Sequence, residues 1–228
     1  YQWGASNVVL SSGTNFNNTV TVVGSQTVTV KSITPAPTIS KVYDGSTTIA
    51  ALGGTPAGVV TGDVVTLNGA GSYADKNAGI NKTYTLTNLA LTGTDAANYS
   101  LSTGTSMTAA NGTIIQKALT LSGIAANDKV YNATITATMN VSNAVFNGMV
   151  AGDALSVTAN GTFGSANVAR NAGNTVIAQT VSYTNTLGGA DAGNYSYNTG
   201  TQTTSAKITP KSLTLVGLTA NDKPYDGS

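Results

Sequence analysis

Apolar and polar residues alternate along much of this chain with a period of two. Residues 19–23 read Thr-Val-Thr-Val-Val and residues 26–30 read Gln-Thr-Val-Thr-Val, with Gly24-Ser25 between them. A period of two places successive side chains on opposite faces of a β-strand, and a glycine between two such runs supplies the positive φ of a hairpin turn. The pattern therefore predicts a β-hairpin over residues 19–30.

The same alternation recurs at later places, and no segment shows the period of an amphipathic helix. Between Leu86 and Leu89 the apolar phase slips by one residue, which predicts either a β-bulge near Thr87-Asn88 or a strand that ends and restarts there. Short strands separated by turn residues are typical of sandwich domains. We therefore expect an all-β chain of tandem antiparallel β-sandwich modules, Ig-like or β-grasp-like, in an elongated array. The alternating segments are residues 64–67, 84–86, 89–91, 119–121, 155–157, 181–183 and 213–215.

A five-residue pattern, Lys-x-Tyr followed by Asp-Gly or Asn-Ala, occurs three times. Tyr43 and Tyr131 lie 88 residues apart, and Tyr131 and Tyr225 lie 94 residues apart. Such spacings are the size of a small domain, so the repeats predict an array of modules. Three further pairs of segments recur in the same order: Gly62-Asp63 with Gly152-Asp153, Asn77-Ala78-Gly79 with Asn171-Ala172-Gly173, and Asp95-Ala96-Ala97-Asn98-Tyr99 with Asp191-Ala192-Gly193-Asn194-Tyr195.

The repeats also predict where one unit ends and the next begins. Related segments with proline lie at residues 33–37 and 208–211. Because proline fixes φ and restricts the residue before it, consecutive modules are expected to meet at a restricted angle. The expected units are the end of a preceding β unit at residues 1–33, modules at residues 34–115 and 116–209, and the start of a third module at residues 210–228.

The three copies of the tyrosine motif favour a structural role. The middle copy has Asn132-Ala133 in place of Asp-Gly. Asp and Asn share the chemistry of an Asx turn but not acid chemistry, so we expect Asp44 or Asn132 to close a turn beside a buried tyrosine whose hydroxyl binds backbone. A ligand site is the alternative, and it predicts that the middle copy has lost its function. The motif residues are Tyr43, Asp44, Gly45, Tyr131, Asn132, Tyr225, Asp226 and Gly227.

The recurring Asp-Ala-x-Asn-Tyr segments also have two interpretations. The structural one is a turn followed by a core tyrosine. The alternative is a calcium site, aided by Asp63 or Asp153, but one carboxylate and one amide fall far short of roughly six to eight oxygen ligands. We therefore expect no metal and no cofactor. The residues concerned are Asp95, Asn98, Tyr99, Asp191, Asn194 and Tyr195.

Isopeptide bonds between Lys and Asn side chains are a further possibility, since some surface modules form them beside a buried acid. Solvated turns are the simpler setting for most of these lysines, because buried lysine is rare without a specific partner. The candidates are Lys41, Lys76, Lys117 and Lys129, with Asp75 or Asp128 as the acid.

The composition argues against several functional classes. The 228 residues contain no Cys, no His and no Glu, and Arg170, the single arginine, lies in a loop that is longer in the second repeat. Acid–base and nucleophilic catalysis usually depend on His, Cys or paired carboxylates, so we expect no enzyme. A formal net charge of +1 gives no electrostatic case for nucleic acid or an anionic membrane. The sequence also lacks an apolar run long enough to insert into a membrane.

In order, the motifs resemble the YDG/MBG-type repeats of large bacterial surface proteins. They are Lys-x-Tyr-Asp-Gly, Gly-Asp-x-Val, Asp-Lys-Asn-Ala-Gly and Asp-Ala-x-Asn-Tyr, closing with Ile-Thr-Pro-Lys-x-Leu-Thr, within residues 34–228. Such repeats are common in filamentous-haemagglutinin-like adhesins of the two-partner secretion type. The resemblance implies a stalk or spacer that supports adhesion or biofilm formation, at the cell surface of a Gram-negative bacterium or secreted from it.

Two other functions stay open at this stage. A carbohydrate-binding module would use aromatic platforms, for which Tyr197 and Trp3 are the best candidates because they lie outside the repeated tyrosine positions. An extracellular β-rich fibre would form if exposed strand edges with few charges paired between chains. The expected partners are neighbouring modules of the same chain, with host or matrix glycans or identical chains as alternatives.

Overall fold

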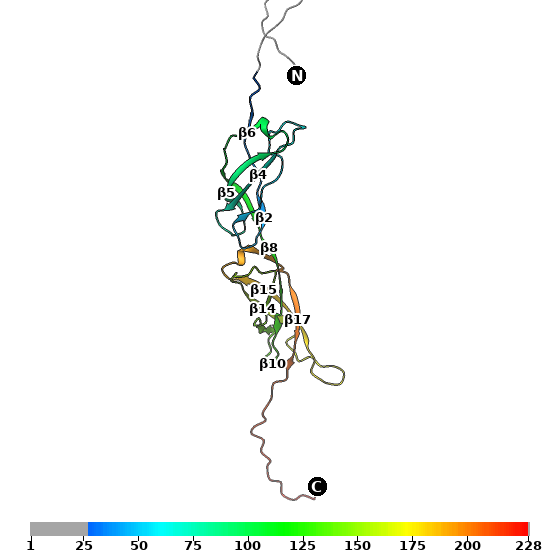
Figure 1. The fold of residues 1–228 in the computed structure, drawn as a ribbon. Coiled ribbons are helices and arrows are strands. Elements are labelled where there is room, and N and C mark those ends of the chain that lie inside the picture. Colours follow the sequence, from blue (N-terminus) through cyan, green and yellow to red (C-terminus); the bar gives the residue numbers. More distant parts are fainter. Residues whose placement is uncertain (1–26, 228) are drawn as a thin grey trace, which may run out of the picture.

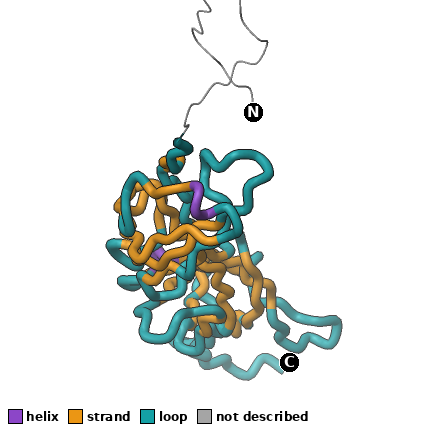
Figure 2. The backbone as a smooth tube through the Cα atoms, turned by 45° about the horizontal axis from the view of Figure 1, so that its top comes forward, coloured by secondary structure: helices purple, strands orange, loops and turns teal. Residues whose placement is uncertain are grey.

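The computed structural model describes residues 27–227. Figure 1 shows two β-rich modules that follow one another along the molecule, and an extended segment that leaves the second module after β18 (Ile208–Thr209). Within these residues the regular structure consists of strands and two 3-10 helices of three residues each (Figure 2), which confirms the expected all-β class. Within residues 27–227, no helix is long and apolar enough to cross a membrane.

The first module is built on a five-stranded sheet with the order β2-β7-β5-β4-β3. Alternate residues of its two long strands point into the core, where Tyr73, Tyr84 and Leu86 are at most 3% exposed. The elements are β1 (Lys31–Ile33), β2 (Ser40–Val42), β3 (Thr48–Ile49), β4 (Thr66–Tyr73), β5 (Gly79–Thr92), η1 (Ala96–Asn98), β6 (Tyr99–Leu101) and β7 (Met107–Ile115).

The second module is built on a four-stranded sheet with the order β11-β14-β15-β17, and smaller sheets complete it. Phe163 and Val181 are buried on facing positions of its long strands. The elements are β8 (Lys117–Ser122), β9 (Ala125–Ala126), β10 (Lys129–Val130), β11 (Thr136–Ala137), β12 (Met139–Asn140), β13 (Val145–Asn147), β14 (Ser156–Phe163), β15 (Gln179–Gly188), η2 (Ala192–Asn194), β16 (Tyr195–Tyr197), β17 (Gln202–Ala206) and β18.

Parallel strand pairs distinguish both modules from the antiparallel modules that we expected. β1 pairs with β6, β2 with β7, β8 with β16, and β10 with β18, all in parallel. Each pair joins strands that lie far apart in the sequence, because parallel neighbours need a long crossover connection. In both modules the first strand lies beside the strand that follows the 3-10 helix. The strand that begins at the tyrosine of each Asp-Ala-x-Asn-Tyr segment therefore pairs with the strand by which the chain enters the module.

The pairing of β1 also shows where the first module begins. Lys31 pairs with Tyr99, as Lys117 pairs with Tyr195 in the second module. Lys31–Ile33 thus form the first strand of the first module, ahead of the start that we expected at residue 34. Of the hairpin expected over residues 19–30, residues 19–26 lie outside the described residues, and residues 27–30 are not in a strand.

A β-bulge lies where the apolar phase slips along the sequence. The pairing of β4 with β5 shifts its register between Asn68 and Ala70, and on β5 the residue Asn88 takes a left-handed φ of 53°. The shift turns both Leu86 and Leu89 into the core, where they are 0% and 3% exposed. The bulge predicted from the sequence is confirmed.

One hydrophobic core runs through the boundary between the modules. Tyr43 and Tyr84 of the first module belong to the same cluster of buried residues as Leu119 and Tyr195 of the second. A single residue, Gln116, separates β7 from β8. The boundary is therefore a packed contact, which we call the joint.

Candidate functional site

The first Lys-x-Tyr-Asp-Gly motif forms a closed turn at the joint. The Asp44 carboxylate accepts hydrogen bonds of 2.9 Å from both the backbone N–H and the hydroxyl of Ser46, which makes an Asx turn. The Lys41 ammonium donates to the backbone carbonyls of Ser46 and Thr48 at 2.8 and 3.0 Å, and it pairs with Asp44 at 2.7 Å. Lys41 thus satisfies the carbonyl groups inside the turn.

The second copy of the motif makes the same turn without a carboxylate. The Asn132 side chain accepts hydrogen bonds from the backbone N–H and the hydroxyl of Thr134. Lys129 donates to the carbonyls of Thr134 and Thr136. The side-chain oxygen that Asp and Asn share therefore closes the turn, as we expected, and no acid is needed for it.

The Tyr43 side chain reaches from this turn to the second module. Its hydroxyl donates to the two carboxylate oxygens of Asp153 at 3.0 and 2.9 Å, and its ring is 1% exposed. The Tyr195 hydroxyl donates to the same carboxylate at 2.5 Å, and the two rings meet edge to face with centroids 5.6 Å apart. Our expectation of a hydroxyl bound to backbone was wrong for Tyr43, because its partner is a carboxylate 110 residues away in the sequence.

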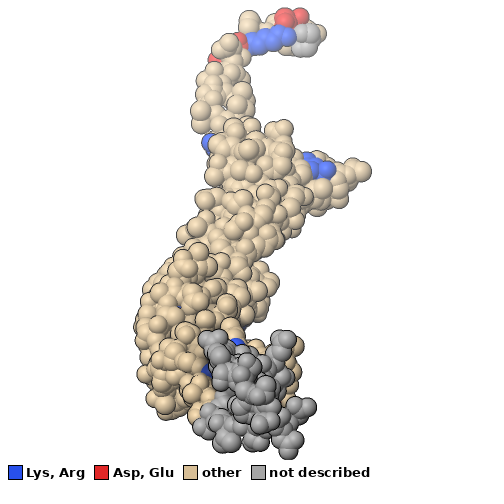
Figure 3. Space-filling model, turned by 90° about the horizontal axis from the view of Figure 1, so that it is seen from above, with Lys and Arg blue, Asp and Glu red and all other residues tan. Residues whose placement is uncertain are grey.

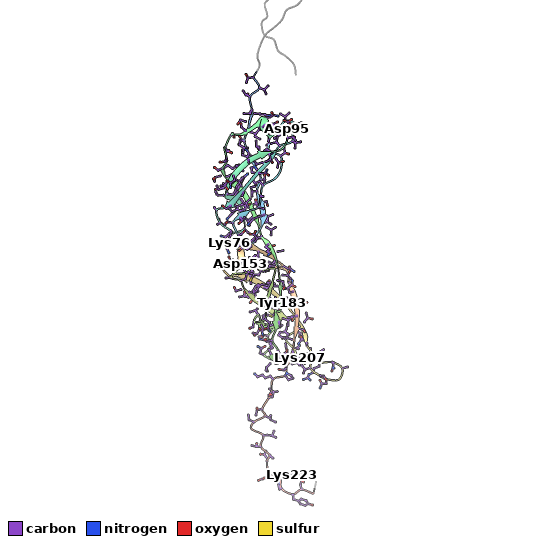
Figure 4. The ribbon with its side chains drawn as sticks, viewed as in Figure 1. Lys76, Asp95, Asp153, Tyr183, Lys207 and Lys223 are labelled. Atoms are coloured by element: carbon purple, nitrogen blue, oxygen red, sulfur yellow. The ribbon has the colours of Figure 1, made fainter. Side chains whose placement is uncertain are left out.

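A lysine completes the charge balance of this cluster. The Lys76 ammonium lies 3.2 Å from the Asp153 carboxylate and 3.1 Å from that of Asp191, and it stands 5.9 Å from the centre of the Tyr43 ring. Figure 4 shows Lys76 and Asp153 next to each other between the modules. The Asp153 side chain is only 2% exposed. A buried carboxylate needs such partners, because leaving it without them costs several kcal/mol.

Amide groups extend the joint beyond the charged cluster. The Asn194 side chain, 3% exposed, accepts a 2.8 Å hydrogen bond from the Ala78 backbone N–H and lies 3.5 Å from the side chain of Asn77. The side chain of Gln116 donates to the Gly193 carbonyl at 2.9 Å. The repeated Asn-Ala-Gly segment of the first module therefore contacts the Asp-Ala-x-Asn-Tyr segment of the second across the joint, whereas we expected the latter to be a simple turn.

The electrostatics favour one protonation state for Asp153, Tyr195 and Lys76 near neutral pH. Burial alone would raise the pKa of Asp153, but hydrogen bonds from Tyr195, Tyr43 and Lys76 outweigh it, so the pKa lies below its usual value. Burial, and then the bond to Asp153, raises the pKa of Tyr195 to about 12. The contacts of Lys76 with Tyr43, Asp191 and Asp153 raise the lysine pKa. The joint thus holds an ionised carboxylate between neutral tyrosines and a charged lysine.

Two features of the joint favour glycine at Gly45: a left-handed backbone conformation and a close neighbour in the second module. Its φ is +80°, a left-handed conformation that side chains disfavour. A Cβ added at this position would stand 2.8 Å from Cγ1 of Val150 in the second module. In the second copy of the motif, Ala133 adopts a φ of 63°. The left-handed turn alone therefore tolerates alanine, whereas the close approach of Val150 favours glycine at Gly45.

Two surfaces meet at the joint, and each recurs once more in the chain. The tyrosine face of the first module consists of Tyr43, Gly45 and Lys76. The aspartate face of the second module consists of Val150, Asp153, Asp191 and Tyr195. By repeat equivalence, the tyrosine face of the second module is Tyr131, Ala133 and Arg170, and the aspartate face of the first module is Val60, Asp63, Asp95 and Tyr99.

The other predicted motif residues lie away from the joint. Asp95 is at the opposite end of the first module (Figure 4), and Asn98 and Tyr99 follow it directly, in η1 and at the start of β6. Tyr131 is 36% exposed, and Tyr225, with Asp226 and Gly227, lies on the extended C-terminal segment, where its side chain is 96% exposed. The structure thus brings together the first copy of the tyrosine motif and the second copy of the Asp-Ala-x-Asn-Tyr segment.

Sequence reasoning missed the role of Lys76. It directly precedes Asn77-Ala78-Gly79, and Arg170 directly precedes the equivalent Asn171-Ala172-Gly173. The longer loop of the second repeat is the feature that the sequence comparison emphasises for Arg170. The signal that could have revealed this role is a cation that recurs directly before the repeated Asn-Ala-Gly motif, in a chain with few charges.

The structure also places the residues named for a calcium site and for carbohydrate binding. Within residues 27–227, no group of three or more acidic side chains converges, and the carboxylates of Asp153 and Asp191 hold the Lys76 ammonium. Tyr197, a candidate for sugar stacking, packs against the core, and its hydroxyl accepts a 3.0 Å bond from the Leu187 N–H. Trp3, the other candidate, lies outside the described residues.

Comparisons with known proteins agree with the repeat. The sequence matches the YDG domain family over residues 26–108 and again over residues 115–205. No curated protein and no solved structure matches the chain. The two matched stretches correspond to the two modules, with the joint between them. The chain therefore belongs to the YDG domain family and carries two copies of the domain.

Proposed function

We propose that this chain is a structural spacer in a bacterial cell-surface or secreted adhesin, in which YDG domains stack end to end as a stalk. The resemblance of the ordered motifs to adhesin repeats supports the biological setting. The structural support comes from the joint. A spacer must hold its modules in line, and the joint is built from the same motifs that define the repeat.

The observation that carries the proposal is the burial of Asp153 between groups of both modules. Domains of one chain move relative to one another unless their interface is extensive and apolar. Here the connection is one residue long, Tyr43 is 1% exposed within a core shared by both modules, and its hydroxyl binds Asp153. Bending the joint would expose this carboxylate or separate it from its partners, so the joint resists bending.

The surface fits a spacer as well. Charged residues make up 8% of the chain, and the face seen in Figure 3 shows few charged side chains. The exposed residues are mostly small and polar, such as Thr, Ser, Asn and Gly. Such a surface is suited to contact with solvent along its length.

The stiffness of the joint tests the proposal. The chain has no cysteine, so Ala90→Cys in β5 and Ser205→Cys in β17, both exposed, place one spin label on each module. We expect a single narrow distance distribution, and we expect Tyr43→Ala to broaden it. The matched control is Tyr131→Ala, which removes the equivalent ring away from the joint and should leave the distribution narrow. A distribution already as broad in the unaltered joint as in Tyr43→Ala would refute the proposal.

The cellular setting has its own test. Antibody labelling of intact bacteria that produce the whole protein should detect these modules on the cell surface or in the secreted fraction. Labelling that appears only after the cells are broken would contradict the proposed location, whatever the stiffness of the joint.

A further inference from the structure

In each module, the strand at the Lys-x-Tyr motif pairs in parallel with the strand by which the chain leaves the module. β2 pairs with β7 in the first module, and β10 pairs with β18 in the second. The tyrosine that follows each motif strand extends the pairing, because the Tyr43 N–H donates to the Ile115 carbonyl and the Tyr131 N–H to the Thr209 carbonyl, both at 2.8 Å. We call each of these parallel pairs a clamp.

The path of the chain determines how tension would act on a clamp. The chain enters the first module at one end of the molecule and leaves the second module at the opposite end (Figure 1). Tension therefore pulls the motif strand at its start and the exit strand at its end. Since the two strands are parallel, these forces point in opposite directions along the strands, and the evenly spaced hydrogen bonds between them share the load.

We propose that the clamps are the force-bearing elements of this chain, and that each module resists tension by the shearing of its clamp. A second parallel pair in each module is loaded in the same sense. The entry strands β1 and β8 pair with β6 and β16, which lead onward to the strand that leaves the module. The use of the clamps to the cell rests on the proposed spacer function, whereas their strength is a property of the fold.

The clamps are shielded from water on the exit strands. Ile114 of β7 is 1% exposed and Ile208 of β18 is 0% exposed. In the second module a side chain adds to the pairing, because the Thr209 hydroxyl donates to the Lys129 carbonyl at 3.2 Å. Hydrogen bonds in such a setting are stronger than those open to solvent. The burial therefore favours a clamp that water does not open strand by strand.

The sequence of the motif agrees with the hydrogen bonds of the clamp. The N–H groups of Lys129 and Tyr131 donate to the carbonyls of β18 and of the residue before it, at 2.8 and 3.0 Å. The N–H of Val130, between them, points away from β18, because alternate residues of a strand face the same neighbour. The third copy of the motif has Pro224 at this position. Proline lacks an N–H, so it fits a position that donates nothing to the clamp.

The direction of pulling provides the first test. The whole chain, held by handles at its two ends in optical tweezers, should unfold in two events, one for each module. Handles on Asn127→Cys and Ser205→Cys, both exposed positions, instead pull the starts of β10 and β18 apart across the strands. The bonds then break one after another, so we expect the second module to unfold at a several-fold lower force. Equal forces in the two directions would overturn the proposal.

Three variants of the second module test the clamp itself under end-to-end tension. Lys129→Pro removes a clamp donor and should raise the unfolding rate at a fixed force about tenfold, which corresponds to about 1.4 kcal/mol of barrier. Lys129→Ala removes the same side chain but keeps the N–H. Val130→Pro introduces a proline without removing a clamp donor. Each of these two controls should raise the rate several-fold less, and the unfolding of the first module should not change.

The outcomes separate this proposal from the stiffness of the joint. Equal unfolding rates in Lys129→Pro and Val130→Pro would overturn the clamp. If Lys129→Pro abolished the event of the second module, the comparison of pulling directions, which needs no change within the clamp, would decide. A broad spin-label distribution together with a high end-to-end force would refute the stiff spacer and leave the clamp standing. A narrow distribution with equal forces in the two pulling directions would do the reverse.

Discussion

Tyr43 and Tyr131 occupy the same turn in two copies of the same motif, yet one ring is 1% exposed and the other 36%. The turns themselves are alike, since Asp44 and Asn132 accept the same pair of hydrogen bonds. What differs is the presence of a following module in the structure. The comparison shows that the tyrosine of this motif is buried by the next module and not by its own. The motif therefore encodes a contact between modules.

The two aspartate faces show the other half of that contact. Tyr99 stays 7% exposed and bound to Asp63 although no module covers that end among the described residues, so the Asp–Tyr pair belongs to its own module. Asn98 is exposed there, while Asn194 is 3% exposed at the joint. One side of the joint is thus assembled in advance, and the neighbouring module adds a tyrosine and a cation. Such a preformed site reduces the entropy lost when the modules meet.

The largest expected effect comes from removing the shared carboxylate. Asp153→Ala leaves the hydroxyls of Tyr43 and Tyr195 without their shared acceptor and removes one of the two carboxylates that hold Lys76, so we expect a loss of about 3–5 kcal/mol in the free energy of unfolding. The matched variant Asp63→Ala removes one tyrosine partner at the uncovered face and should cost about 1–2 kcal/mol. Urea unfolding followed by circular dichroism measures both. Equal losses in the two variants would contradict a special role for the joint.

A smaller effect is expected at alkaline pH. The folded-state pKa of Tyr195 is raised from about 10 to about 12, so its stabilising contribution is complete below pH 10 and is lost as the pH rises through 12. The loss should be on the order of 2 kcal/mol. Unfolding free energies measured between pH 8 and pH 12, roughly the range set by these pKa values, should fall less steeply in Tyr195→Phe. The same slope in that variant would assign the titration to another group.

At acid pH, the stability of the joint is expected to change with pH in the opposite direction. The folded-state pKa of Asp153 is lowered, so its contribution is present above the usual pKa of an aspartate and is lost as the pH falls through the folded value. The joint is therefore expected to be most stable between these two limits.

The smallest expected effects concern the turn residues. Gly45→Ala adds a Cβ that would stand 2.8 Å from Val150 in a left-handed turn, so we expect a loss of about 1–2 kcal/mol. The reverse change, Ala133→Gly, relieves a left-handed alanine and should stabilise the chain by less than about 1 kcal/mol, because glycine also gains entropy when unfolded. Thermal unfolding of both variants checks this pair. Destabilisation by Ala133→Gly would show that the alanine side chain makes a useful contact.

Several features could be predicted because they depend on neighbours in the sequence. The alternating pattern predicts the strands, the slip between Leu86 and Leu89 predicts the bulge, and the exchange of Asp44 for Asn132 predicts an Asx turn. Each rests on the direction of side chains along a strand or on a hydrogen bond two residues away. These local rules do not depend on which strands pair.

The parallel pairings and the partner of Tyr43 could not be predicted in this way. β1 pairs with β6 across most of the first module, and Tyr43 meets Asp153 across the boundary between modules. Such contacts are chosen by how whole strands close on each other, and no local pattern records the choice. For Lys76 the sequence did carry a signal, the recurring cation before Asn-Ala-Gly, but its partners became known only from their positions in space.

The sequence by itself determined that this protein is a repeat of β-modules, how long each repeat is, and which residues form its turns, because these properties follow from period, spacing and local hydrogen bonding. Only the tertiary structure decided that the tyrosine of one module and the aspartate of the next belong to a single buried cluster. The physical reason is that burial depends on what lies opposite a side chain. The same Lys-x-Tyr turn is a packed joint where another module lies against it, and it is half-exposed where no module packs on it among the described residues.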